Sequence, residues 1–583
     1  MAQGWLQIAV FLAVLVAIVP LLGGYMAKVF SGEPVLLSRV LGPLERLLYR
    51  VMRVDPGQGQ DWKRYARSVL VFSGAFWLAL YVILRTQTLH PWNPQGFHSG
   101  TWDVTFNTAS SFVTNTNWQY YGGETTMTYF SQMAGLAVQN FVSAAVGIAV
   151  VVALIRGIAA RSGTSLGNFW QDLVRVLLYV LLPISLVGAV VLVSLGVVQS
   201  FGHYATAHTL AGGTQAIALG PVASQEVIKE LGTNGGGFFN ANSAHPFENP
   251  TGLTNFLEML LILAIPASLT YTYGRMVGNA RQGWAILSAM AILFVVGVAV
   301  VFAAEQHGTP AQHLAGVNTH HLAGSTGGNL EGKEQRFGIA GTALWATITT
   351  VTSCGAVNGA MESLTGIGGA VPFSNLGVSE VVFGGVGTGL YSMLVFVLLA
   401  VFIGGLMVGR TPEFLGKKIE ARDIKLATLA ALFTPLTVLI TAGTAIASPA
   451  GRQSISTSGP NGFSENLYAY LSQANNNGSA WAGYSGYVQP QPGNLGAHGV
   501  RLADLMGGLT MLFGRFAPIL LVLAIAGGLA GKRVHPPGLG TLRTDTPTFV
   551  VLLIGVIVLV GALTFFPAIL LGPVVQGLTT RLF

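Results

Sequence analysis

The dominant pattern along the chain is a series of long apolar stretches separated by polar segments. Stretches such as Ile286 to Ala304 and Phe549 to Phe566 carry no charge over roughly the 20 positions that a helix needs to cross a bilayer. The predominantly apolar stretches are residues 4–29, 68–86, 130–155, 172–199, 254–276, 283–304, 376–409, 424–447, 505–531 and 547–571. This pattern predicts an all-α polytopic membrane protein with ten transmembrane helices.

Composition supports this interpretation and excludes several function classes. Hydrophobic residues make up 51% of the 583 positions and charged residues only 9%, whereas soluble domains carry about 25% charged residues. The net charge of +7 does not indicate a nucleic-acid partner, because the basic residues gather at the ends of apolar spans. A single cysteine, Cys354, excludes an internal disulfide framework and a multi-cysteine metal site.

Basic residues mark one side of the predicted membrane. The segments that follow the odd-numbered spans hold most of the 29 Lys and Arg, whereas the opposite loops are rich in Gly, Asn, Ser and Thr. These basic residues include Arg39, Arg46, Arg50, Arg53, Lys63, Arg64, Arg67, Arg156, Arg161, Arg281, Arg410, Lys417, Lys418, Lys532 and Arg533. Because basic loops stay in the cytoplasm, we expect both chain termini to face outward, with membrane lipids as neighbours.

Four short polar stretches on the outer side repeat at a near-constant spacing. Their central residues Asn117, Gly235, Gly355 and Gly478 lie 118, 120 and 123 residues apart. An apolar segment too short to span the membrane precedes each stretch, and each unit lies between two full spans. The chain is therefore expected to contain four pseudo-symmetric span–pore-loop–span repeats at 68–158, 171–277, 283–410 and 424–533, with extra spans at 1–30 and 547–583.

The chemistry of these loops indicates a pore for a monovalent cation. Non-helical backbone survives at membrane depth only where it is buried in protein or lines a wet cavity, and rings of backbone carbonyls can replace the hydration shell of potassium. Glycine permits the left-handed φ values that aim successive carbonyls at one axis. The four loops contain no Asp or Glu, which would favour divalent ions. Ordinary Gly/Asn turns are the alternative, but four equally spaced copies favour the pore.

The sequence thus predicts a potassium filter built from neutral oxygen atoms. Its expected members are Thr114, Asn115, Thr116, Asn117, Gln119, Thr233, Asn234, Gly235, Gly236, Thr352, Ser353, Cys354, Gly355, Asn476, Asn477 and Gly478. Gln119 is expected to tune the apparent affinity through its amide. Asn117 departs from the pattern, because the other three units have glycine at this position.

Charged and glycine-rich positions inside spans indicate a barrier below the filter. Arg515 lies midway along the ninth span, roughly 24 Å from its inner end, too far to reach the cytoplasm. In the seventh span, Glu380 precedes glycines that should break a helix, namely Gly384, Gly385, Gly387 and Gly389. A packing hinge is the alternative explanation of these glycines. Glu258 and Glu362 follow two of the loops and either attract cations or complement helix N-termini.

A resemblance to a known family rests on several of these segments. The stretch from Gly232 to Pro250, GTNGGGFFNANSAHPFENP, is similar to a signature of the KdpA family, the potassium-transporting subunits of the bacterial Kdp ATPase. Residues 113–119, 352–356, 404–418 and 475–479 agree as well, and the similarity covers essentially the whole chain. The resemblance implies a superfamily of potassium transporters, a location in the bacterial inner membrane, and a glycine-rich seventh span that gates the inner side near a tunnel.

The resemblance also implies partners and a division of labour. Expected partners are a P-type ATPase subunit (KdpB-like), a single-span subunit on the periplasmic side (KdpC-like) and a small single-span subunit (KdpF-like). The chain itself has no Asp-Lys-Thr-Gly phosphorylation motif and no GxxxxGK[ST] phosphate loop, so it is expected to be a non-catalytic subunit that binds potassium and no organic cofactor.

Two other functions stay open from the sequence alone. A stand-alone or symport-type potassium channel of the same superfamily would share the fourfold pore. A membrane-embedded transferase would need clustered carboxylates, histidines or a metal triad facing one membrane surface. The histidines of the outer loops, such as His203, His307 and the pair His320 and His321, are scattered without such partners.

Overall fold

The computed structural model describes residues 2–321, 327–379, 381–407, 409, 411–485, 501–536 and 541–579. Among these residues, ten helices are long and apolar enough to cross a membrane, which confirms the predicted fold class. They are α1 (Ala2–Ser31), α3 (Trp62–Arg85), η2 (Ser131–Ala137) with α6 (Val138–Ala159), α7 (Phe169–Arg175) with η3 (Val176–Leu181) and α8 (Leu182–Ser194), α10 (Gly252–Met276), α11 (Ala280–His307), α15 (Thr388–Met407), α16 (Ala421–Ala447), α19 (Arg501–Ala530), and α20 (Pro547–Ile569) with η6 (Leu570–Val574) and α21 (Val575–Leu578).

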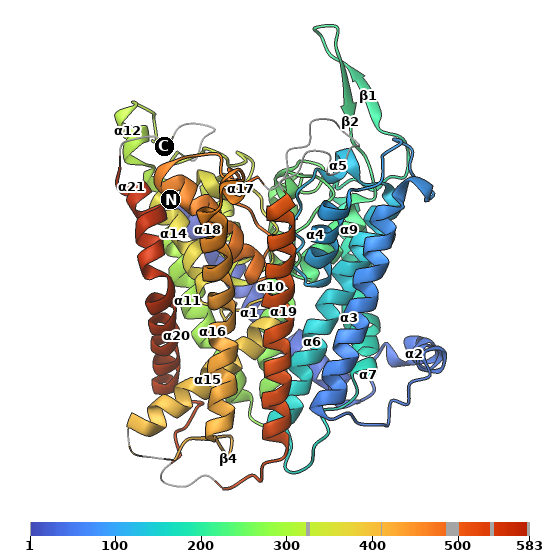
Figure 1. Ribbon diagram of the computed structural model, residues 1–583, viewed down its shortest axis with the longest axis vertical. Helices are drawn as coiled ribbons and strands as arrows, with labels where there is room; N and C mark the ends of the chain where they lie inside the picture. Colours follow the sequence, from blue (N-terminus) through green and yellow to red (C-terminus); the bar gives the residue numbers. More distant parts are fainter. Residues whose placement is uncertain are drawn as a thin grey trace.

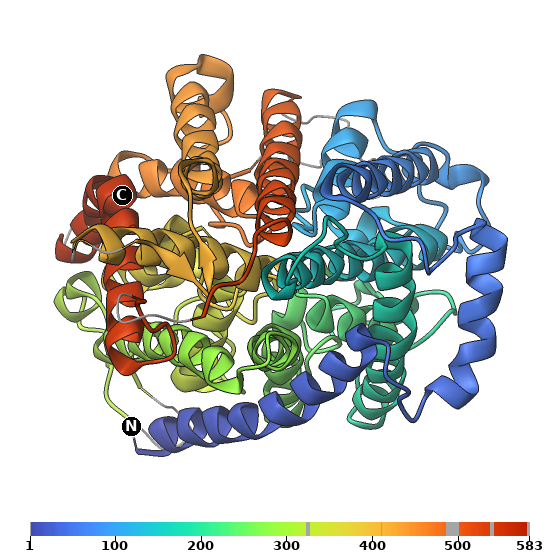
Figure 2. The ribbon, with the colours of Figure 1, turned by 90° about the horizontal axis from the view of Figure 1, so that it is seen from below.

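Four shorter helices end inside the bundle, one between each pair of consecutive spans in the expected units. These half-helices are α4 (Trp102–Val113), α9 (Val222–Leu231), α13 (Gly338–Val351) and α18 (Gly459–Ala474). In Figure 2 the colours follow one another around the centre of the molecule, so consecutive parts of the chain surround a common axis. Figure 1 shows the starts of α1 and α21 at the same end of the bundle as α18.

The remaining elements are short and lie mostly at the two ends of the bundle. They are α2 (Ser38–Met52), α5 (Gly123–Thr126), α12 (Pro310–Leu314), α14 (Gly366–Gly377), α17 (Pro449–Arg452), the 3₁₀ turns η1 (Gln87–Leu89), η4 (Asn242–Ala244) and η5 (Met361–Ser363), and the antiparallel hairpins β1 (Ala205–His208) with β2 (Thr214–Ile217) and β3 (Glu413–Phe414) with β4 (Lys417–Lys418).

The sequence pattern did not predict α2, which Figure 1 shows projecting sideways from the lower end of the bundle. Its exposed apolar side chains recur every three or four residues, at Val40, Leu44, Leu47 and Val51, and its arginines occupy other positions. This arrangement is typical of a helix that lies along a membrane surface. It was missed because the segment is too short and too charged to match a spanning pattern.

The predicted seventh span, 376–409, was wrong at its start. The chain is helical up to Gly377, leaves the helix, and becomes helical again only at Thr388. Positive φ values at Phe383 (59°), Gly384 (59°) and Gly387 (87°) interrupt the helix, because a right-handed helix cannot accommodate them. The expected break therefore exists, and it separates α14 from α15.

A buried ion pair ties several of the spans together at the end near α2. The guanidinium of Arg156 on α6 donates to both carboxylate oxygens of Asp172 on α7, at 2.6 and 2.8 Å, and to the carbonyl of Phe30 at 3.1 Å. The hydroxyl of Tyr65 on α3 donates to the same carboxylate at 3.0 Å. The side chain of Asp172 is fully buried, so its charge depends on these partners.

We expect Arg156→Ala to lower the free energy of unfolding by about 3 kcal/mol, because it leaves the Asp172 carboxylate buried without its cation. Thermal unfolding of the purified chain in detergent measures the loss. Arg161→Ala, which removes an exposed arginine from the loop after α6, is the control and should unfold like the wild type. The double variant Arg156→Leu/Asp172→Leu should recover most of the loss. Equal stability of Arg156→Ala and the wild type would contradict this role.

Candidate functional site

The carbonyl ends of the four half-helices lead directly into the four polar loops. The half-helices end at Thr114, Gly232, Thr352 and Asn475, which cap α4, α9, α13 and α18. Because the helix dipole is negative at this end, each half-helix favours a cation beyond its last turn.

The backbone of the four loops repeats the same local geometry. In each loop one amide N–H donates to the carbonyl five residues earlier: Thr116 to Ser111 (3.0 Å), Asn234 to Lys229 (2.9 Å), Cys354 to Thr349 (3.0 Å) and Asn477 to Ser472 (2.8 Å). The residue before each of these amides is left-handed: Asn115 (φ 69°), Thr233 (49°), Ser353 (48°) and Asn476 (53°). Four copies of one unusual backbone turn therefore lie at equivalent places in the four units.

The loops converge on one point. A Cβ atom added to Gly235 would lie 2.8 Å from the carbonyl oxygen of Thr116, 2.9 Å from that of Asn477 and 3.1 Å from that of Cys354. These three residues are the counterparts of Asn234 in the other loops. Carbonyls from the other three units thus crowd around Gly235 of the second, and no side chain fits there.

Glycine serves two different purposes at the central positions. Gly355 (φ 92°) and Gly478 (φ 103°) are left-handed, as the sequence predicts, whereas Gly235 is not and is needed for close approach. Asn117 is left-handed as well (φ 58°), and asparagine is one of the few residues that tolerate this conformation. The first unit therefore keeps a left-handed residue at this position although it lacks the glycine.

Side-chain donors link each loop to its neighbours. The Asn115 amide donates to the Thr233 carbonyl (2.8 Å), and the Cys354 thiol contacts the Asn234 carbonyl (3.3 Å). In the fourth loop, the Asn477 amide donates to the Thr349 carbonyl (2.8 Å) and the Asn476 amide to the Thr116 hydroxyl (3.0 Å). These contacts join loops one and two, two and three, three and four, and four and one. They close a ring around the axis.

A vestibule of about 720 Å³ lies on one side of this ring. Its lining includes all four central residues, Asn117, Gly235, Gly355 and Gly478. Gln119 also lines it, and its amide is engaged with the backbone of Gly237, accepting from the N–H at 3.1 Å and donating to the carbonyl at 3.3 Å. The Gln119 side chain therefore braces the first loop against the second.

Several predicted residues support the ring without facing it. The hydroxyls of Thr114 and Thr352 donate to carbonyls in the last turn of their own half-helices, at 2.8 and 2.6 Å. Gly236 packs against Phe112, since a Cβ there would lie 2.9 Å from that ring. These residues hold the loop backbone in place.

The glycine break and the buried arginine meet beneath the ring. The Gly384 N–H donates to the Val351 carbonyl at 2.7 Å, and the Val386 N–H donates to the Thr233 hydroxyl at 3.0 Å. Arg515, which is 3% exposed, donates to the Thr388 hydroxyl at 2.6 Å. Two further predicted glycines lie in the same segment: Gly387 packs against Gly147 of α6, and Gly389 opens the first turn of α15.

A Cβ at Gly385 would lie 3.7 Å from the Thr352 carbonyl, so this segment runs directly under loops two and three. The predicted site residue Glu380 lies outside the described residues.

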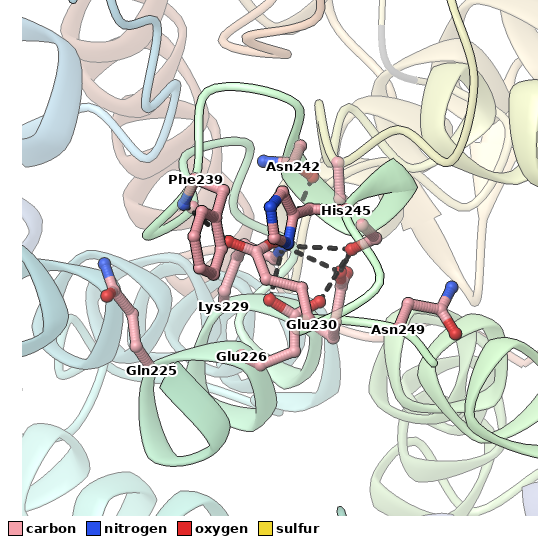
Figure 3. Close-up of polar contacts among 12 residues, drawn as sticks. Gln225, Glu226, Lys229, Glu230, Phe239, Asn242, His245 and Asn249 are labelled. Carbon is pink, nitrogen blue, oxygen red and sulfur yellow. Dashed lines mark hydrogen bonds and ion pairs between the residues drawn. The ribbon is translucent and has the colours of Figure 1, made fainter. Parts of the chain in front are cut away.

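The sequence analysis missed the polar side chains that support the loops from behind. Two of them, Asn140 and Ser143, lie within the apolar span α6. The side-chain oxygen of Asn140 accepts a hydrogen bond from the Asn117 amide, and the Ser143 hydroxyl donates to the side-chain oxygen of Asn115. A second group surrounds Lys229 of α9, whose ammonium lies among carboxylates (Figure 3). Polar or charged residues inside apolar or membrane-embedded segments were the available signal.

The structure places Glu258 inside the protein, beside other carboxylates. Glu258 lies in the second turn of α10 and is fully buried, so it does not sit at the exposed start of the helix. One of its carboxylate oxygens lies within 4.8 Å of one oxygen of Glu226 and one of Glu230.

Comparison with known proteins gives a consistent result. The family model described as "KdpA: Potassium-transporting ATPase A subunit" matches residues 9–578. The potassium-transporting ATPase potassium-binding subunit of Rhizobium rhizogenes is 54% identical over 577 residues, covering 99% of this chain and 98% of that protein. The subunit of the same name from Sorangium cellulosum is 55% identical over 586 residues, covering 99% of both.

Among solved structures, the potassium transporter TrkH from Vibrio parahaemolyticus has a similar fold. Its TM-score is 0.50 at 14% sequence identity, and the match covers 80% of this chain and 86% of that one. At this identity the likeness concerns the fold alone.

Proposed function

Because the chain belongs to the KdpA family, the A subunits of potassium-transporting ATPases, we propose that the carbonyl ring of its four loops is a potassium-selective filter. The chain then acts as the potassium-binding subunit of the pump. It takes potassium from the vestibule, removes its water at the ring and passes it toward the ATPase subunit.

The observation that carries this proposal is the surroundings of Gly235, where carbonyl oxygens from the other three loops lie within about 3 Å of one point. Neutral carbonyl oxygens can replace the hydration shell of a monovalent cation and still release it. The negative ends of four half-helices add attraction without a fixed charge. Predicted filter residues that face away from the axis, such as Thr114 and Thr352, hold the loop backbone.

We further propose that the Gly384–Gly389 segment and Arg515 form the barrier between filter and cytoplasm. A pump must not leak, and the segment lies directly beneath loops two and three. A fixed guanidinium adds electrostatic repulsion: two unit charges about 6 Å apart at an effective dielectric of 20 repel by about 3 kcal/mol. Potassium held above this barrier leaves sideways, toward the ATPase subunit, past the region of Glu380.

The orientation and partners complete the proposal. The basic segments face the cytoplasm of a bacterial inner membrane, both termini face outward, and KdpB-like, KdpC-like and KdpF-like subunits complete the complex. The chain divides into units at 68–158, 171–277, 283–410 and 424–533 between two extra spans. A stand-alone or symport-type channel is disfavoured, because the relatives at 53–55% identity are named as subunits of an ATPase.

Replacement of Gly235 by Ala or Asp tests the filter. Either Cβ meets three carbonyl oxygens, and Asp adds a buried charge, so we expect potassium-over-sodium discrimination to fall about tenfold or transport to stop. The measurement is the half-maximal concentration of each ion for ATP hydrolysis by the purified complex. Gly252→Ala is the control, since nothing lies within 4 Å of a Cβ there. Unchanged selectivity in both Gly235 variants would remove the filter from this site.

Replacement of Arg515 by Ala tests the barrier. We expect potassium to leak through the complex without ATP, because the fixed positive charge below the filter is lost. Potassium flux into liposomes, with and without ATP, measures the leak. Arg515→Lys keeps the charge and should remain tight, and shortening the Gly384–Gly389 segment should leak as Ala does. If the Ala and shortened variants stay leak-free and fully coupled, the barrier lies elsewhere.

A further inference from the structure

The residue behind each loop carries a hydroxyl group in three units and an ammonium group in the second. The carbonyl that accepts the repeated amide bond belongs to Ser111, Thr349 or Ser472 in three units and to Lys229 in the second. The Thr349 hydroxyl accepts the Gly355 N–H (2.9 Å), and the Ser472 hydroxyl accepts the Gly478 N–H (3.0 Å). An ammonium group has no acceptor, so Lys229 cannot support Gly235 in the same manner.

Lys229 instead reaches the second loop through Asn242. Its ammonium donates to the Asn242 side-chain carbonyl at 3.2 Å, and the amide nitrogen of Asn242 donates to the Gly235 carbonyl at 2.8 Å. The Val357 N–H, just beyond loop three, donates to the same Asn242 oxygen at 3.1 Å. A continuous hydrogen-bonded path therefore runs from a buried positive charge to the Gly235 carbonyl, which directly follows the Asn234 carbonyl along the second loop.

Carboxylates fix the ammonium in this position (Figure 3). Lys229 is fully buried, and its Nζ atom lies 2.7 Å from Glu226, 3.3 Å from Glu230 and 3.3 Å from Glu248. The hydroxyl of Ser243 also contacts the ammonium, at 3.1 Å. Since a buried lysine without partners would lose its proton, this set of carboxylates keeps Lys229 charged.

The cluster contains more acid than one lysine can neutralise. Glu258 brings a fourth buried carboxyl group, and neither of its oxygens has a hydrogen-bond partner among the described residues. Four ionised carboxylates beside one ammonium would leave a large uncompensated charge away from water, so part of the cluster is protonated. Burial, which outweighs the opposing effect of Lys229, raises the pKa of Glu248 to about 8.

We propose that Lys229 is a positioning residue for ion selection, acting through Asn242 on the Gly235 carbonyl. This inference rests on the proposed filter function. The ammonium polarises the Asn242 amide and so strengthens the hydrogen bond that the amide N–H donates to the Gly235 carbonyl. This bond fixes the direction of the carbonyl. Without that bond the carbonyl can turn, and the ring accommodates ions of other radii, such as rubidium, more readily.

Asn242→Gly isolates the path from the charge cluster. Glycine tolerates the left-handed backbone at this position (φ 57°) and removes only the amide, while the ion pairs of Lys229 remain. Asn358→Gly is the matched control: it removes another buried amide after the neighbouring loop, one that bonds to Asn255 at 2.8 Å. Lys229→Met removes the charge, and Lys229→Arg retains it.

The readout is heat stability of the purified full chain in KCl or RbCl, at an ionic strength held constant with choline chloride. The half-maximal concentrations of the two salts give a selectivity ratio that a purely structural role would not move. We expect this ratio to fall about tenfold, toward rubidium, in Asn242→Gly and Lys229→Met. It should stay at the wild-type value in Asn358→Gly and close to it in Lys229→Arg.

The outcomes separate the two proposals. If the wild type prefers potassium and Asn242→Gly keeps the wild-type ratio, even with lower heat stability, Lys229 and Asn242 are structural and this inference is overturned. Because Asn242→Gly leaves the ion pairs intact, it decides the question if Lys229→Met fails to fold. If the wild-type chain itself shows no preference between potassium and other monovalent ions, the proposed filter function fails.

Discussion

The structure depends on holding four sets of backbone carbonyls at one axis, where their like-oriented dipoles repel one another. A buried carbonyl normally pairs with a donor, and an unpaired one is costly. Here the oxygens of Thr116, Cys354 and Asn477 crowd around Gly235 without side chains between them. Such crowding persists only when the surrounding protein fixes the backbone from behind and a cation balances it in front.

Each part of the bundle contributes to that constraint. The half-helices bring their carbonyl ends inward, and left-handed residues such as Asn115 and Ser353 turn the chain at the same step in each unit. Side-chain amides then link neighbouring loops into a ring. The break between α14 and α15 places backbone donors under loops two and three, so this interrupted segment supports both loops from below.

Much of this architecture could be predicted from the sequence, because hydrophobic length and regular spacing are strong signals. The ten spans, the break in the seventh and the convergence of the four loops followed from local pattern. The start of the seventh span did not, since the helix already ends at Gly377, before the first of the glycines that predicted the break. The reason for a glycine at position 235 could not be predicted either. It lies in the close approach of carbonyls from the other three loops and not in the φ of Gly235 itself.

The supporting side chains show a second limit of sequence reasoning. Asn242 looks like an ordinary loop residue, and its link to the Gly235 carbonyl and Lys229 exists only after the chain folds back on itself. Three charged residues, Glu226, Lys229 and Glu230, lie in one short helix at membrane depth, and this pattern could have indicated a buried charge cluster. Their neighbours Glu248 and Glu258 come from later segments, and no spacing rule identifies them.

The central claim is that the loop carbonyls, and not the buried carboxylates, bind the transported ion. Anomalous diffraction from crystals grown with thallium in place of potassium locates a monovalent ion directly. We expect a peak on the axis between the carbonyls of Thr116, Asn234, Cys354 and Asn477, and its loss when potassium is added in excess. A peak instead among Glu226, Glu230 and Glu258, with none on the axis, would contradict the account.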